Sequence, residues 1–164
     1  MMKKIFNIYY LVIILSITLI ACGKKDDGVT PVTPSTWNVL GDNFKATSTI
    51  RLGNDTLYAS DTLSLNGING VEIFFGKTPV SGTYDIVAPK PVAVIAPNQC
   101  GIGIIYDFLY IYSVSGGSLN VTIKNNKITA VFNNIDMSKE TNFSINTGYS
   151  FAPFGTASGV IIEQ

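Results

Sequence analysis

Few side chains in this chain of 164 residues could carry out catalysis. Histidine is absent, so the most common general base and the most common transition-metal ligand are both missing. Cys100 has no histidine to activate it, and its surroundings at residues 99–103 predict a small buried core residue, with a reactive thiol as the alternative. These residue types argue against an enzyme, and the sequence predicts neither a cofactor nor a metal site.

Carboxylates are the remaining route to catalysis. A glycan hydrolase needs two of them on opposite sides of a cleft. The spacing along this chain predicts no such pair, so a hydrolase ranks third among the expected functions. The acidic residues considered are Glu72, Glu140, Glu163, Asp85 and Asp107. Calcium could bind the oxygen-rich segments 54–55 and 133–136, although asparagine and aspartate serve equally well in turns.

Cys22 carries the clearest chemical pattern in the chain. It follows Leu-Ile-Ala at residues 19–21, and this order resembles a bacterial lipobox, in which the cysteine thiol accepts a diacylglyceryl group before the chain is cut ahead of it. Two lysines precede the apolar stretch, which is the layout of a secretory signal. The sequence therefore predicts a signal peptide over residues 1–21 and a mature protein held on the membrane by acyl chains. A retained transmembrane anchor is the alternative, but the apolar stretch 5–21 is short for a span.

A tether is expected between the lipid and the folded part of the protein. Residues 22–36 have little apolar content, so we expect them to be extended in front of a single domain over residues 37–164. Lys25, Asp26 and Asp27 resemble the acidic export signal of surface lipoproteins in Bacteroidota. That resemblance implies an outer-membrane protein exposed on the cell surface. A solvated charge cluster in a protein that faces the periplasm is the alternative.

The net charge makes nucleic acid an unexpected partner. The whole chain has 11 basic and 11 acidic residues. Removal of the signal peptide takes away Lys3 and Lys4 and leaves nine basic against eleven acidic residues. A nucleic-acid surface needs an excess of positive charge. The expected partners are the membrane, reached through the N-terminal lipid, and a glycan or an envelope protein.

Alternation of polar and apolar residues, together with frequent turn residues, predicts an all-β domain. Residues 44–52 are typical of one half-buried strand, and the positions on its buried face are Phe44, Ala46, Ser48, Ile50 and Leu52. Further strands are expected at residues 62–65, 71–75, 83–87, 102–112, 119–124, 127–133, 142–146 and 159–162. Many short strands are typical of an antiparallel β-sandwich, with a closed lipocalin-like β-barrel as the alternative.

Aromatic residues recur at every second position at Tyr106, Phe108, Tyr110 and Tyr112. If the strand is regular, the four rings line one of its faces. Such a face could stack sugar rings or a peptide, because tyrosine combines a flat apolar body with a polar tip. Alternatively, the rings belong to the core. The proline-containing segment 88–98 is expected to form an exposed loop, either for binding or as a plain connection.

Four segments resemble one family of proteins. Residues 115–123, 126–132 and 143–149, together with Gly-Thr-Tyr at 82–84, are similar to strands of small uncharacterised surface lipoproteins of Bacteroidota. Where those relatives have Gly-Thr-Phe after the isoleucine, this chain has Thr-Ala-Val-Phe at 129–132. The resemblance implies a β-sandwich-like fold and assigns no function.

Two Asp-Thr-Leu tripeptides resemble the acceptor of O-glycosylation in Bacteroidota, which makes Thr56 and Thr62 candidate modification sites. Taken together, the patterns predict a non-enzymatic, lipid-anchored envelope protein that binds a glycan, a peptide or an envelope partner. A structural or assembly subunit of an outer-membrane complex is the alternative function.

Overall fold

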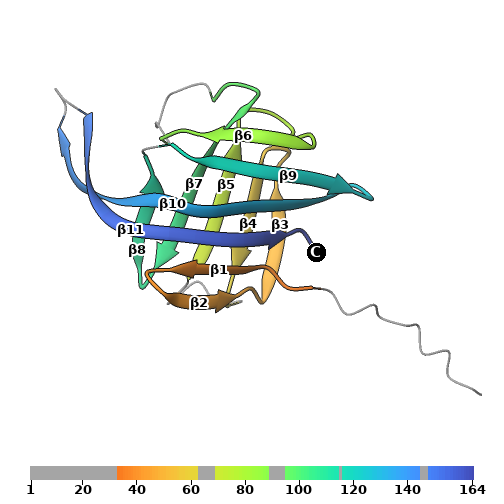
Figure 1. Ribbon diagram of the computed structural model, residues 1–164, viewed down its shortest axis with the longest axis horizontal. Helices are drawn as coiled ribbons and strands as arrows, with labels where there is room; N and C mark the ends of the chain where they lie inside the picture. Colours follow the sequence, from red (N-terminus) through yellow and green to blue (C-terminus); the bar gives the residue numbers. More distant parts are fainter. Residues whose placement is uncertain (1–32, 63–68, 89–94, 115, 145–147) are drawn as a thin grey trace, which may run out of the picture. The chain divides into compact units, whose positions relative to one another are not determined.

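The computed structural model describes residues 33–62, 69–88, 95–114, 116–144 and 148–164, and these contain strands and no helix (Figure 1). The prediction of an all-β chain is therefore confirmed. Several predicted features lie outside the described residues, namely the signal peptide, Cys22, the export signal at residues 25–27, the strand positions 63–65 and most of the loop 88–98. The strands are β1 (Thr36–Val39), β2 (Asp42–Lys45), β3 (Ser48–Leu52), β4 (Thr56–Ser60), β5 (Gly70–Phe75), β6 (Gly82–Ile86), β7 (Gln99–Tyr106), β8 (Leu109–Ser113), β9 (Ser118–Lys124), β10 (Lys127–Ser144) and β11 (Gly148–Ile162).

All these strands join into one mixed sheet, in the order β2-β1-β11-β10-β9-β6-β7-β5-β4-β3. Among the described strands, β6 and β7 pair in parallel and the other pairs are antiparallel. Figure 1 shows β9, β10, β11 and β1 crossing in front of β3, β4, β5 and β7. Two strands connect these layers, because β6 pairs with both β9 and β7, and β8 pairs with both β10 and β7.

The core lies between the two layers and is built by alternation along each strand. In β5, Val71 and Ile73 are fully buried, whereas Glu72 between them points outward. The front layer contributes Phe132 from β10, which is among the largest fully buried side chains. Burial of each such side chain contributes about 1.5–3 kcal/mol, so the alternation fixes which face of every strand turns inward.

The strand predicted over residues 44–52 is wrong, because the chain forms two strands there, β2 and β3. Between these two strands the chain crosses from one layer to the other. At the crossing, the Ala46 amide donates to the backbone carbonyl of Ser35, and the Thr47 amide donates to that of Ser60. This crossing shifts the alternation by one residue. Thr49 is consequently buried, whereas Ile50 and Leu52 are 46% and 44% exposed.

Most of the other predicted strands exist, with different lengths. The strands expected at residues 71–75, 83–87 and 119–124 correspond to β5, β6 and β9. β10 and β11 are much longer than expected and form one hairpin interrupted by register shifts. β1 and β4 were not among the predicted strands, and both are short, with four and five residues.

Contacts at the C-terminus tie β3 to the front layer. The Ser35 hydroxyl lies 2.7 Å from the Thr49 hydroxyl and accepts a hydrogen bond from the Ile162 amide. Ser35 is buried, although the sequence places it in the tether. Arg51 forms an ion pair with Glu163 at 2.6 Å. These contacts hold both ends of the domain together at one point.

Candidate functional site

The four aromatic residues expected on one face are separated by a turn. β7 ends at Tyr106 and β8 begins at Leu109, with Asp107 and Phe108 between them at φ angles of 46° and 64°. Two consecutive residues with positive φ make a tight hairpin turn. The predicted single strand over 102–112 is therefore wrong, and the four rings do not share a face.

Tyr106 points toward the interior and packs with the core. Its ring lies 6.0 Å from Phe44 and 5.9 Å from Phe154, both in edge contacts. Its hydroxyl donates to Asp42 at 2.7 Å, and this bond raises the pKa of the tyrosine. Phe108 at the turn is 75% exposed. Of the four rings, only those of Tyr110 and Tyr112 remain as candidates for an outward binding face.

Tyr110 and Tyr112 lie on the outer face of β8, where a row of paired residues crosses the sheet. Tyr112 pairs with Gly103, Gly103 with Glu72, and Glu72 with Tyr58. Neighbours of these residues along each strand are buried, so the row points outward. We call the group of Tyr58, Glu72, Tyr110, Tyr112 and Phe151 the tyrosine surface.

Tyr110 lies against the sheet because Gly103 has no side chain. A Cβ atom at Gly103 would stand 2.7 Å from both Cε1 and the hydroxyl of Tyr110, closer than atoms can approach. The Tyr110 hydroxyl donates a hydrogen bond to the Glu72 carboxylate. Burial, followed by this hydrogen bond, raises the pKa of Tyr110. These contacts fix the position of the ring and keep its phenol protonated.

Further rings extend the surface beyond Tyr110. The centroids of Tyr110 and Tyr112 are 4.7 Å apart with the planes at 39°, and Tyr112 meets Phe151 of β11 edge-on at 6.1 Å. Tyr58, Glu72 and Phe151 were missed by the sequence analysis, since they lie far from β8 along the chain. The alternating glycines at 101 and 103 within an apolar strand were the one available indication, because a strand glycine marks a close approach.

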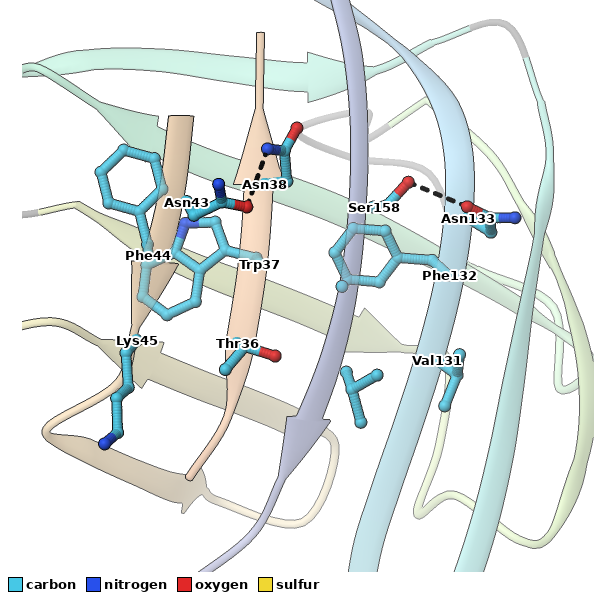
Figure 2. Close-up of a pocket in the computed structure, with 12 residues that line it drawn as sticks. Thr36, Trp37, Asn38, Asn43, Phe44, Lys45, Val131, Phe132, Asn133 and Ser158 are labelled. Carbon is cyan, nitrogen blue, oxygen red and sulfur yellow. Dashed lines mark hydrogen bonds between the residues drawn. The ribbon is translucent and has the colours of Figure 1, made fainter. Parts of the chain in front are cut away.

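A depression separate from the tyrosine surface lies over β1, β2, β10 and β11 and has a volume of about 670 Å³. Figure 2 shows Asn38 bonded to Asn43 and Ser158 bonded to Asn133 across it. Its outward side chains are Thr36, Asn38, Asn43, Lys45, Val131, Asn133, Ser158 and Val160. Because its amides already bond to one another, this depression is a weaker candidate for ligand binding than the tyrosine surface.

The predicted burial of Cys100 is confirmed. The side chain is fully buried in β7, and desolvation followed by the charge of Asp85 raises the pKa of its thiol to about 12. A thiol that keeps its proton is a poor nucleophile. Cys100 is thus a core residue.

The carboxylates and the candidate calcium segments are dispersed. Glu163 is engaged by Arg51 and by the Ile128 amide, and Glu72 accepts from Tyr110. In the part of the chain that the structure describes, no three metal-ligating side chains gather in one place. Asn134 adopts a positive φ at a register shift of β10, and its amide donates to Ser158, which is a role in the backbone geometry.

The two candidate glycosylation sites occupy different settings. Thr56 begins β4 with a half-buried side chain whose hydroxyl donates to Asp55 at 3.3 Å. Thr62 is half-buried after β4, and the leucine of its tripeptide lies outside the described residues. Both modifications remain predictions.

Across the described segments, no helix has the length and apolar character needed to cross a bilayer. Comparisons of the chain with family models, curated proteins and solved structures found no match. The functional argument therefore starts from the tyrosine surface itself.

Proposed function

We propose that the protein is a non-enzymatic binding domain, anchored by a lipid on the outer membrane and exposed at the cell surface, that takes a glycan on the tyrosine surface. The observation that supports this proposal is the position of Tyr110, which lies against Gly103 and is fixed by Glu72. A ring held in this way binds a ligand without further loss of side-chain freedom.

The chemistry of the tyrosine surface suits a sugar. The apolar face of a pyranose ring stacks on an aromatic ring, while the hydroxyl groups at its rim need hydrogen-bond partners. Glu72 offers a carboxylate directly beside the rings of Tyr110 and Tyr112. Stacking and hydrogen bonding are thus available at one place.

The two end strands of the sheet, β2 and β3, are poor templates for strand addition by an assembly partner. β2 has four residues and ends in a lysine, Lys45. β3 has five residues, and the backbone of Thr49 accepts a hydrogen bond from the amide of Gln164. Short edges with charged or covered positions resist the addition of a foreign strand.

Lipid attachment at Cys22 is tested by metabolic labelling with a fatty acid. The native protein is expected to incorporate the label and to begin at an acylated Cys22 in mass spectrometry, whereas Cys22→Ser incorporates none. Cys100→Ser is the control and should be labelled like the native protein, since this thiol is buried. A native protein that retains Met1, or a labelled Cys22→Ser variant, would contradict lipid anchoring.

Glycan binding is tested by affinity electrophoresis in gels that contain soluble polysaccharides. Tyr112→Ala should weaken the binding of a retarding polysaccharide about tenfold, which corresponds to about 1.4 kcal/mol. Phe108→Ala removes a ring that is more exposed but belongs to the β7–β8 turn, so its mobility should match the native protein. Equal losses in the two variants, or undiminished binding by Tyr112→Ala, would rule out the tyrosine surface as the binding site.

A further inference from the structure

Among the outward positions of β4, β5, β7 and β8, Glu72 is the only charged residue. The outward positions of β4, β5, β7 and β8 are otherwise occupied by neutral residues. They are Thr56, Tyr58, Ser60, Gly70, Phe74, Gln99, Gly101, Gly103, Ile105, Tyr110 and Tyr112. These positions thus carry one carboxylate and no cation, and the exposed Glu140 of β10, which pairs with Phe151, adds a second negative charge at the border of the tyrosine surface.

The Glu72 carboxylate has no ion-pair partner among the described residues, in contrast to Glu163, which pairs with Arg51. Tyr110 donates to Oε2 of Glu72, and a hydroxyl donor leaves the negative charge in place. Glu72 itself is half-buried, and the hydrogen bond from Tyr110 engages only one of its two carboxylate oxygens.

The rings around Glu72 add to the attraction for a positive charge. The face of an aromatic ring carries negative potential, and a cation within about 6 Å of its centre is stabilised. Tyr110 and Tyr112 lie side by side next to the carboxylate, and Tyr58 is paired with Glu72 across β4 and β5. A carboxylate and several ring faces at one place form a setting for an ammonium group.

We infer that the glycan bound at the tyrosine surface contains an unacetylated amino sugar, whose ammonium group binds Glu72 while the sugar ring stacks on Tyr110 and Tyr112. This inference rests on the proposed function, because it names the class of glycan that the same surface takes. A neutral sugar would leave the Glu72 charge half-desolvated and unpaired, whereas an ammonium group pairs with it.

The test uses three hexasaccharides that differ only in the group at carbon 2 of each β-1,4-linked unit. Hexaglucosamine carries an ammonium group, hexa-N-acetylchitohexaose an acetamide and cellohexaose a hydroxyl. In calorimetric titrations at mildly acidic pH, hexaglucosamine should bind the native protein at least about tenfold more tightly than the other two, and added salt should reduce this preference.

Glu72→Gln keeps an acceptor for the Tyr110 hydroxyl and removes only the charge. This variant should bind hexaglucosamine about tenfold more weakly than the native protein and should lose the preference for hexaglucosamine over cellohexaose. Asp85→Asn, which removes an exposed carboxylate from β6, is the matched control and should bind hexaglucosamine like the native protein.

The outcomes separate the two proposals. Equal affinities of the native protein for all three hexasaccharides would overturn the amino-sugar inference and leave glycan binding standing. A preference for hexaglucosamine that survives in Glu72→Gln would overturn the role of this carboxylate. If none of the three binds, the inference fails, and glycan binding itself is then decided by the polysaccharide gels and the Tyr112→Ala variant.

Discussion

Replacement of Phe132 with alanine is expected to lower the free energy of unfolding by about 3–5 kcal/mol. The ring is only 2% exposed, and it occupies the space above Gly159, where a Cβ atom would stand 2.6 Å from its Cζ atom. Trp37 borders the same space, so removal of the ring opens a cavity that this neighbour fills only in part. A domain of this size has about 5–15 kcal/mol of stability, so the variant should unfold at a much lower urea concentration.

Val131 provides the matched control, since it neighbours Phe132 on β10 but points outward and is 38% exposed. Val131→Ala should cost less than about 1 kcal/mol. Gly159→Ala should destabilise the native protein by about 1–3 kcal/mol through overpacking, yet it should raise the stability of Phe132→Ala, because its methyl group enters the cavity. Similar urea midpoints for Phe132→Ala and Val131→Ala would contradict this account of the core.

The strand content of the domain was predictable because it depends on local alternation. In β5, Val71, Ile73 and Phe75 are buried and alternate with the half-buried Glu72 and Phe74. The partners of each strand were not predictable in the same way. Tyr112 lies in one row with Glu72 and Tyr58, and these residues are brought together only by the pairing of four strands.

Two local features explain the errors in the sequence analysis. The turn between β7 and β8 has Phe108 at a φ of 64°, a conformation in which glycine or asparagine is usual, so the residue types give no indication of a turn there. The crossing at Ala46 and Thr47 shifts the alternation by one residue, and its cause is a pair of hydrogen bonds to distant residues. In both places, tertiary contacts override the local pattern.

Only part of the candidate site could be predicted, because the rest depends on how distant strands pair. Tyr110 and Tyr112 attract attention in the sequence because aromatic residues alternate there. Glu72 does not stand out in the sequence, and the glycine at 103 indicates only a close approach until the register of β5, β7 and β8 brings both residues to Tyr110 and Tyr112. The chemistry of the tyrosine surface thus depends on a pairing that composition and spacing do not encode.

Gly103→Ala is expected to abolish glycan binding while the domain remains folded. The new methyl group would occupy the place of the Tyr110 ring, 2.7 Å from Cε1 and from the hydroxyl oxygen, so the ring must rotate away from the sheet. This rotation separates the hydroxyl from Glu72 and disturbs the contact with Tyr112. The expected cost is about 1–3 kcal/mol of stability, together with loss of measurable retardation in the polysaccharide gels.

A double-mutant cycle with Tyr110→Ala separates the ring contact from other effects of the methyl group. Once the ring is absent, Gly103→Ala should no longer destabilise the protein, and it should stabilise the strand by about 0.5–1 kcal/mol, since alanine loses less backbone freedom on folding than glycine. The measurement is urea unfolding of the native protein, both single variants and the double variant. A coupling energy near zero would mean that the ring does not rest on Gly103, whereas a reversal of sign supports a tyrosine held in place against Gly103 as the basis of the binding surface.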